Sequence, residues 1–292
     1  MKKKHINIKG ELLPVAPPLV MGILNVTPDS FHAASRKQTE AEIHLRVEEI
    51  LSHGARIIDI GGCSSRPGAE LPPADIERQR LRPALEILKE YPESIISVDT
   101  FRADIVRFAA EEYGAAIVND ISGGDLDPNM FQTVATLQLP YILMHNRGTP
   151  QQMQHQTAYA NLLIDIRQVL SAKVRELQLL GLNDIIIDPG FGFGKTLEQN
   201  YELMACLSEF QIFDLPVLVG ISRKSMIYNL LSLTPAESLN GTTALNVLAL
   251  LNGASILRVH DVREAVEAIH IVSEYQKYEP IKPTITCGRK SE

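Results

Sequence analysis

Short apolar runs alternate with amphipathic stretches along most of the chain. Each run has four to seven residues, the length of a buried strand rather than a helix, and most runs end in a polar residue. The eight runs are residues 19–25, 57–61, 95–99, 116–120, 141–145, 185–188, 216–221 and 255–260. Runs rich in β-branched residues are typical of parallel strands buried on both faces.

The stretches between the runs carry helix signals. Leucine, isoleucine and valine recur every three or four residues from 162 to 177, which predicts an amphipathic helix. Asp261, with Glu264 three residues later, resembles a capping box. Asp127-Pro128 and Thr234-Pro235 each resemble a helix cap followed by proline at the first helical position.

Eight strand-then-helix units in about 240 residues predict an α/β protein with a (β/α)8 TIM barrel. The first eighteen residues alternate weakly and contain Pro14, Pro17 and Pro18, which predicts a short N-terminal strand or hairpin. An open, doubly wound sheet is the structural alternative. Because no linker rich in Gly, Ser or Pro divides the chain, residues 1–292 are expected to form a single domain.

The amino-acid composition bears on the cellular compartment of the protein and on the ligands it can bind. Apolar residues make up 45% and charged residues 22%, as in globular proteins, and no apolar run reaches the ~18 residues of a membrane span. No signal peptide is evident, so a cytoplasmic protein is expected. The three cysteines form no C-x-x-C pair, and the net charge of −7 argues against nucleic-acid binding. Any anionic ligand must then be held by a few placed cations.

Residues 185–195 carry the strongest local signal for a site. An apolar strand ends in Asp188, and a loop with glycines at 190, 192 and 194 follows. The glycines permit close approach of a ligand, while Phe191 and Phe193 suit contact with a flat ring. This arrangement favours a planar heterocycle with a donor edge. The structural alternative is that Asp188 caps the next helix and both phenylalanines belong to the core.

Residues at the carboxyl ends of barrel strands converge on one mouth, where the active site lies. The polar residues there fall into two sets. The first set suits the amide, amine and ring nitrogens of a heterocycle and consists of Asp99, Asn119, Asp188 and Lys224. The second set suits an anion, with a place for a metal, and consists of Arg258, His260, Arg66 and Asn25.

Other polar residues at the strand ends favour structural roles. Asp59 and Asp120 are expected to accept hydrogen bonds from loop amides. His145 and His260 lack the spacing of a two-histidine metal site, so satisfied or phosphate-binding histidines are expected. Cys63 has no recognisable partner that would make it a nucleophile.

Seven motifs follow one another along the chain: MGILNVTPDSF (21–31), GGCSSRPG (61–68), SVDTF (97–101), NDISGG (119–124), DPGFGFGK (188–195), SRKS (222–225) and RVHD (258–261). In these motifs the chain resembles the dihydropteroate synthase family over nearly its whole length. All seven occur in the family's order, which is stronger evidence than any one motif.

The resemblance implies a transferase that joins 6-hydroxymethyl-7,8-dihydropterin diphosphate to p-aminobenzoate by an SN1-like step, giving 7,8-dihydropteroate and pyrophosphate. It implies a pterin pocket of Asp99, Asn119, Met144, Asp188, Phe193 and Lys224. It implies diphosphate ligands Asn25, Arg66, Arg258 and His260, with Mg2+ held through Asn25. It implies p-aminobenzoate contacts from Phe31, Ser65, Pro67 and Ser225. Asp99, Asp188, Lys224 and Arg66 are the implied catalytic residues, and a homodimer is implied as well.

The chain departs from the family pattern in two loops. Residues 32–35 read His-Ala-Ala-Ser where many members have Ser-Asp-Gly-Gly, Ser65 stands for a commoner threonine, and Cys63 for a commoner glutamate. These changes put the affinity for the second substrate in doubt. Two other functions stay open: a methyltetrahydrofolate-dependent methyltransferase to a corrinoid protein, which needs no diphosphate clamp, and a catalytically silent pterin-binding relative.

Overall fold

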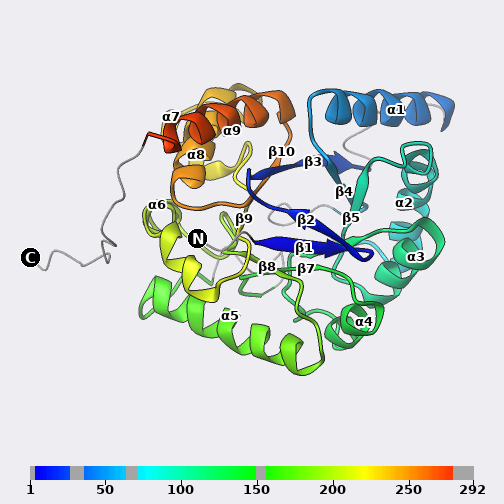
Figure 1. The fold of residues 1–292 in the computed structure, drawn as a ribbon, viewed down its shortest axis with the longest axis horizontal. Helices are drawn as coiled ribbons and strands as arrows, with labels where there is room; N and C mark the ends of the chain where they lie inside the picture. The colour runs from blue at the N-terminus through cyan, green and yellow to red at the C-terminus, as the bar shows by residue number, and fades with distance from the viewer. Residues whose placement is uncertain (1–3, 27–35, 64–70, 149–155, 279–292) are drawn as a thin grey trace, which may run out of the picture.

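Eight parallel strands surrounded by helices form the predicted barrel (Figure 1). The computed structural model describes residues 4–26, 36–63, 71–148 and 156–278, with the backbone alone for residues 36–39. The strands lie in the order β8-β7-β6-β5-β4-β3-β10-β9, and a parallel bridge between Ile187 and Val217 joins the two edges. Their bounds are β3 (Leu19–Asn25), β4 (Ile57–Gly61), β5 (Ile95–Asp99), β6 (Ile117–Asp120), β7 (Tyr141–Met144), β8 (Ile185–Asp188), β9 (Leu218–Val219) and β10 (Ile256–Val259).

An antiparallel hairpin precedes the barrel, as the sequence predicted. It consists of β1 (His5–Ile8) and β2 (Glu11–Pro14), joined by Lys9 and Gly10, both with positive φ as a two-residue hairpin turn requires. The hairpin lies across the centre of the ring of strands in Figure 1. Its Ile6, with Val15 just beyond, packs into the lower barrel interior and closes that end.

Helices cover the outside of the strands. The α-helices are α1 (Arg36–Ser52), α2 (Ala74–Leu88), α3 (Ala103–Tyr113), α4 (Met130–Leu137), α5 (Leu162–Leu179), α6 (Leu197–Ala205), α7 (Ser225–Leu231), α8 (Leu239–Leu251) and α9 (Val262–Gln276). The described part of the chain also contains two 3-10 helices, η2 (Leu207–Phe213) and η3 (Pro235–Glu237). In the part of the chain that the structure describes, no helix is both long and apolar enough to cross a membrane.

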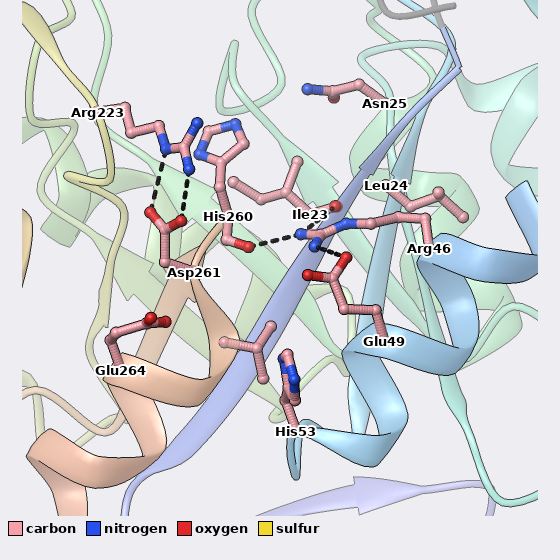
Figure 2. A pocket seen from close by; sticks show the side chains of 11 residues that line it. Ile23, Leu24, Asn25, Arg46, Glu49, His53, Arg223, His260, Asp261 and Glu264 are labelled. Carbon is pink, nitrogen blue, oxygen red and sulfur yellow. Dashed lines mark hydrogen bonds and ion pairs between the residues drawn. The ribbon is translucent and has the colours of Figure 1, made fainter. Parts of the chain in front are cut away.

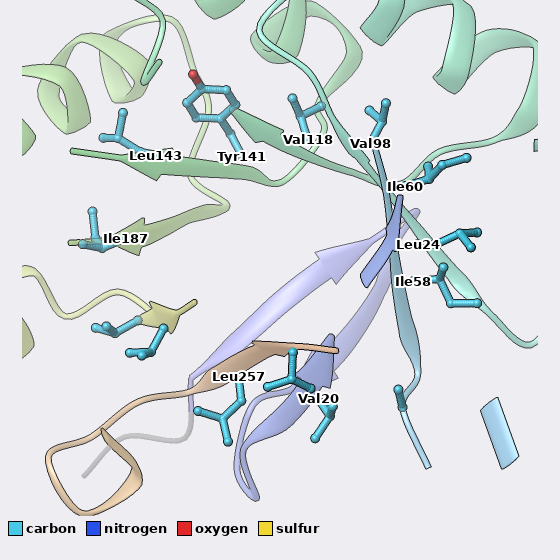
Figure 3. Packing of buried hydrophobic residues seen from close by; sticks show 14 of the residues in the cluster. Val20, Leu24, Ile58, Ile60, Val98, Val118, Tyr141, Leu143, Ile187 and Leu257 are labelled. Atoms are coloured by element: carbon cyan, nitrogen blue, oxygen red, sulfur yellow. The ribbon is translucent and has the colours of Figure 1, made fainter. Parts of the chain in front are cut away.

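Alternation along each strand separates two cores. Outward residues such as Val20, Leu24, Ile58 and Ile60 pack against the helices in the larger core (Figure 3). The inward residues nearest the hairpin form a second, smaller apolar layer of Met21, Ile57, Ile117, Ile142, Ile186, Leu218 and Ile256. Two residues further along each strand, side chains face the same interior but lie nearer the carboxyl end. Polar residues placed there therefore lie next to this apolar layer, on the side of the carboxyl ends.

Several local predictions need correction. The run 216–221 gives only the two-residue strand β9, because Pro216 has no N–H and the backbone amides of Ser255 and Ile256 both donate to the Val217 carbonyl. Helix α4 begins at Met130 rather than at Pro128. The Asp127 carboxylate still accepts from the amide of Asn129, as a cap would, and it also accepts from the amide of Ala103.

The two remaining cap predictions had opposite outcomes. The prediction of Thr234 as a cap followed by proline is confirmed, although the helix it starts is the 3-10 helix η3, and Glu237 completes a capping box there. The Asp261 capping box is wrong. The Asp261 carboxylate makes no cap hydrogen bond and instead accepts two hydrogen bonds from Arg223.

Strand β3 packs closely on α1, and this contact depends on Gly22. A methyl group on Gly22 would lie 2.5 Å from Cγ2 of Ile50. We expect Gly22→Ala to lower the free energy of unfolding in urea by about 1–3 kcal/mol, because overpacking outweighs the gain in backbone entropy. Combining it with Ile50→Ala should cost less than the sum of the two single changes. Strict additivity of the two would contradict this account of the contact.

Candidate active site

Strand register brings one residue from each of four neighbouring strands into one row, and three of these residues carry polar side chains. Asn25 on β3 pairs with Gly61 on β4, Gly61 with Asp99 on β5, and Asp99 with Asn119 on β6. Gly61 leaves room in this row, since a methyl group on it would lie 3.6 Å from both Asn25 Oδ1 and Asp99 Oδ2. Met144 and Asp188 pair in the same way on β7 and β8. The register thus assembles the predicted pocket at the carboxyl ends.

Arg258 on β10 joins two buried carboxylates of this mouth. Its Nε donates to Asp59 Oδ2 and its Nη2 to Asp99 Oδ2, each at 2.6 Å. Burial alone would lower the pKa of Arg258, but the charges of Asp59 and Asp99 outweigh burial and raise it. Burial raises the pKa of Asp99, and Arg258 opposes that rise. Arg258, predicted to bind diphosphate, therefore also belongs to the heterocycle pocket.

The prediction for Asp59 is wrong and that for Asp120 is correct. Asp59 accepts from the side chains of Ser97 (2.6 Å), Asn119 (2.9 Å) and Arg258 rather than from loop amides. Asp120 accepts from the amides of Ser122 and Gly124, and from the Ser122 and Tyr141 hydroxyls. Asp120 therefore shapes a loop, whereas Asp59 holds side chains of the candidate site.

Asp188 and Lys224 face the same pocket from β8 and the start of α7. Asp188 Oδ1 accepts from the Gly190 amide at 2.7 Å, so part of its role is to fix its own loop. Burial raises the pKa of Asp188, and the charge of Lys224 opposes this. Burial lowers the pKa of Lys224 to about 8, and the charges of Asp188 and Asp99 act against that lowering. Two acids thus share one partly desolvated ammonium.

The two phenylalanines of the glycine loop differ in role. Phe193 packs with Met144 and Phe101 at the mouth, and Lys224 Nζ lies 4.4 Å from the centre of its ring. Phe191 is fully buried in the outer core, so the prediction that it lies against a ligand ring is wrong. Its carbonyl still contributes, because it accepts from Lys224 Nζ at 2.5 Å.

Lys195 is a buried residue of this loop that sequence reasoning missed. Its Nζ donates to the carbonyls of Gly190 (2.7 Å) and Phe193 (3.0 Å) and lies 3.2 Å from His145 Nδ1. Burial lowers the pKa of Lys195 to about 7. The pKa of His145 is lowered to about 2 by burial and by the positive charge of Lys195. A neutral His145 therefore accepts from Lys195. The only advance signal was the lysine that follows Gly-Phe-Gly.

An open cavity of about 470 Å³ lies beside this pocket, between β3, α1 and the start of α9 (Figure 2). Asn25 and His260 line it, as predicted, and so do Arg46 and Arg223, which the sequence did not single out. Arg46 Nη2 donates to the His260 carbonyl at 2.6 Å, and Ser222 Oγ lies 3.0 Å from His260 Nδ1. The pKa of His260 is lowered to about 4, mainly by burial and further by the positive charges of Arg258 and Arg223.

The remaining predicted residues divide between described and undescribed segments. Ser225 begins α7, next to Lys224. Phe31, Ser65, Arg66 and Pro67 lie outside the described residues. Cys63 is half-buried, and burial together with the charge of Glu77 raises its pKa well above the usual range. A thiol held protonated in this way is a poor nucleophile, in agreement with the sequence analysis.

Comparisons with known proteins identify the family of the chain. The model of the family described as pterin binding enzyme matches residues 21–260. Dihydropteroate synthase of Escherichia coli (strain K12) is 41% identical over 266 residues, covering 90% of this chain and 94% of that protein. The enzyme of Synechocystis is 43% identical over 258 residues, covering 87% and 89%.

Solved structures give the same result. Yersinia pestis dihydropteroate synthase in a sulfonamide drug complex superposes with a TM-score of 0.88 at 40% identity, covering 94% of this chain and 100% of that one. The Xanthomonas albilineans enzyme in complex with 7,8-dihydropteroate superposes with a TM-score of 0.83 at 31% identity, covering 95% and 100%. The chain therefore belongs to the pterin-binding enzymes and, among them, to the dihydropteroate synthase family.

Proposed function

We propose that the chain joins 6-hydroxymethyl-7,8-dihydropterin diphosphate to p-aminobenzoate at the carboxyl ends of its strands, releasing pyrophosphate and 7,8-dihydropteroate. The main support for this pterin site is that Asp99, Asn119, Asp188 and Lys224 converge above the inner apolar layer, with Phe193 beside them. Carboxylates accept from the amine and ring N–H groups of a pterin, and the ammonium donates to its acceptors. Met144 adds an apolar wall.

The diphosphate is assigned to the neighbouring cavity. Its basic residues are His260, Arg223 and Arg46. Arg223 is paired with Asp261 and Arg46 with Glu49, and Glu264 lines the cavity as well. A dianionic group placed there would gain from these cations and would raise the low pKa of His260, so that its imidazole takes up a proton and donates. Arg66, outside the described residues, stays a predicted ligand and catalytic residue.

A magnesium ion fits the donor chemistry at Asn25. Mg2+ prefers oxygen ligands and takes several of them from substrate phosphates and water. Among the described residues no cluster of three or more His, Cys, Asp or Glu side chains is placed to hold a metal. Asn25, at the cavity wall, supplies one amide oxygen, and the substrate is left to supply others. When bound, the ion would neutralise part of the charge on the leaving group.

The proposed chemical step is dissociative. The bond between the pterin methylene carbon and the diphosphate oxygen breaks, and its electrons leave with the diphosphate. Asp99 and Asp188 stabilise the positive charge that spreads into the ring. The paired Arg258 favours the ionised form of Asp99, and the charge of Lys224 favours that of Asp188. The p-aminobenzoate amine then attacks the methylene carbon and loses a proton to solvent. Ser225 is proposed to contact p-aminobenzoate, with Phe31, Ser65 and Pro67 as further predicted contacts.

The homodimer is also proposed, and three helices that pack in succession support it. Helices α7, α8 and α9, with the turn after α7, expose large apolar side chains on the outer surface: Leu230, Leu231, Leu233, Leu248, Leu251, Ile271 and Tyr275. Exposed apolar side chains gathered in one region are typical of a protein contact. A single domain over residues 1–292 and a cytoplasmic location remain predictions.

Asp188→Asn tests the pterin pocket. The fold should be kept, because the amide oxygen still accepts from Gly190, but pterin should bind roughly ten- to a hundredfold more weakly in calorimetry, since a charge-assisted hydrogen bond of ~1.5–3 kcal/mol is lost. Asp184→Asn is the matched control, because Asp184 lies just before the opposite end of the same strand, where it is half-buried. Equal pterin affinity of the two variants would remove Asp188 from the pocket.

Pyrophosphate release tests the reaction and the metal together. Release should require pterin diphosphate, p-aminobenzoate and magnesium, and Asn25→Ala should raise the magnesium concentration needed for half-maximal rate. Asn252→Ala, at the end of α8 and before the amino end of β10, should not change it. Release without magnesium would refute the metal assignment. No release under any of these conditions would instead indicate a catalytically silent pterin-binding protein.

Leu248→Asp tests the homodimer. Leu248 is 46% exposed on α8, so a charge there should disrupt an apolar contact between two copies while leaving the monomer folded. Sedimentation velocity should then show a dimer for the wild type and a monomer for the variant. Leu12→Asp, which changes a 68% exposed side chain on the hairpin, should stay dimeric. A monomeric wild type, or a dimeric Leu248→Asp protein, would refute the assigned surface.

A further inference from the structure

Asp59 lies beneath the proposed pterin pocket, and the sequence assigned it no functional role. It sits in the middle of β4 and is fully buried. Its Oδ1 accepts from Ser97 Oγ, and its Oδ2 accepts from both Asn119 Nδ2 and Arg258 Nε. These three partners come from β5, β6 and β10, so one carboxylate ties together the inner side chains of three strands.

The contact with Asp59 fixes which atom Asn119 presents to a ligand. A carboxylate accepts hydrogen bonds and has none to donate, so the Asn119 amide must turn its Nδ2 toward Asp59. The Asn119 Oδ1 atom is then directed away from Asp59. Without the carboxylate, the amide is free to turn over, and an acceptor would become a donor at the same place. Asp59 thereby sets the polarity of the pocket at Asn119.

The contact with Asp59 also fixes Arg258. The guanidinium has five N–H donors in a rigid plane, and here Nε is taken by Asp59 while Nη2 reaches Asp99. Two carboxylates bound at two nitrogens define the plane and the direction of the whole group. The third nitrogen, Nη1, is engaged by neither of them. Asp59 thus holds Arg258 from below while Asp99 holds it from the side of the pterin pocket.

We propose that Asp59 is a positioning residue of the pterin pocket, which holds the Asn119 amide and the Arg258 guanidinium in the orientations that the pterin ring requires. The inference rests on the pocket proposed above. Asp59 touches no substrate in this account and acts through its two partners. A merely structural buried ion pair would instead stabilise the barrel without favouring either ligand.

Asp59→Asn removes the negative charge of the side chain and keeps its shape. The asparagine Oδ1 is placed to accept from Asn119 and Arg258, while its Nδ2 donates to Ser97, whose hydroxyl turns to accept. The contacts are kept but lose the assistance of the charge, so the orientations they hold become looser. Pterin affinity should fall roughly tenfold in calorimetry. Affinity for pyrophosphate with magnesium should fall clearly less than affinity for pterin, because Arg223, Arg46 and His260 are untouched and only Arg258 is loosened.

Two further variants make the result decisive. Ser97→Ala removes one partner of Asp59 but leaves its charge and its contacts with Asn119 and Arg258, so pterin affinity should stay within about twofold of wild type. Asp99→Asn checks the pocket itself. If Asp99→Asn leaves pterin affinity unchanged, the proposed pocket is wrong. If Asp99→Asn weakens pterin binding and Asp59→Asn does not, or weakens both ligands equally, the pocket stands and the role given to Asp59 is wrong.

A measurement on the wild-type protein covers the case in which Asp59→Asn does not fold. The Arg258 Nε–H signal in a nitrogen-15 NMR spectrum, assigned by its loss in Arg258→Lys, should exchange slowly with solvent because this proton is buried against Asp59. It should stay protected when pterin binds. Loss of protection on pterin binding would show that Asp59 releases Arg258, and would overturn the proposal.

Discussion

One largely buried cation, Arg258, shared between two buried carboxylates organises the polar half of the barrel interior. Its side chain spans from β10 across β3 to Asp59 on β4 and Asp99 on β5. Charges removed from water in this way are stable only while paired, and removing one partner of a buried pair typically costs ~3–5 kcal/mol. The apolar layer beneath them, closed by Ile6 of the hairpin, keeps water from entering at the other end. The fold therefore fixes these charges before any ligand arrives.

The same constraint explains why the mouth suits the reaction of its family. Asp188 lies among Lys224, Lys195 and Arg258, whose charges oppose the rise in pKa that its burial causes. Lys195 holds the loop carbonyls of Gly190 and Phe193. In the proposed binding mode, the carboxylates lie beside the ring that gains positive charge, and the diphosphate occupies the neighbouring cavity, whose basic residues include Arg223 and Arg46. Groups aligned in advance need little reorganisation as charge moves in the reaction, which is how a preorganised site lowers a barrier.

The sequence predicted the parts of this structure that depend on local pattern. The ends of β3, β4, β5 and β8 match the apolar runs to the residue, because each run stops at the polar or glycine residue that begins the mouth. Contacts between distant residues were not predictable. Asp59 and Arg258 are separated by 199 positions, and no local feature pairs them. Asp261 failed as a helix cap for the same reason, since Arg223, 38 positions earlier, takes its carboxylate.

The central claim is that buried carboxylates at the strand ends bind the pterin, and the pKa of Asp188 tests it most directly. Burial raises this pKa in the free protein. Ring N–H groups that donate to the carboxylate would favour its charged form and lower the pKa. The measurement is a pH titration of the Asp188 carboxyl carbon by carbon-13 NMR, assigned with Asp188→Asn, with and without pterin. The account predicts a raised pKa in the free protein and a clear fall with pterin, and an unchanged pKa with pterin bound would contradict it.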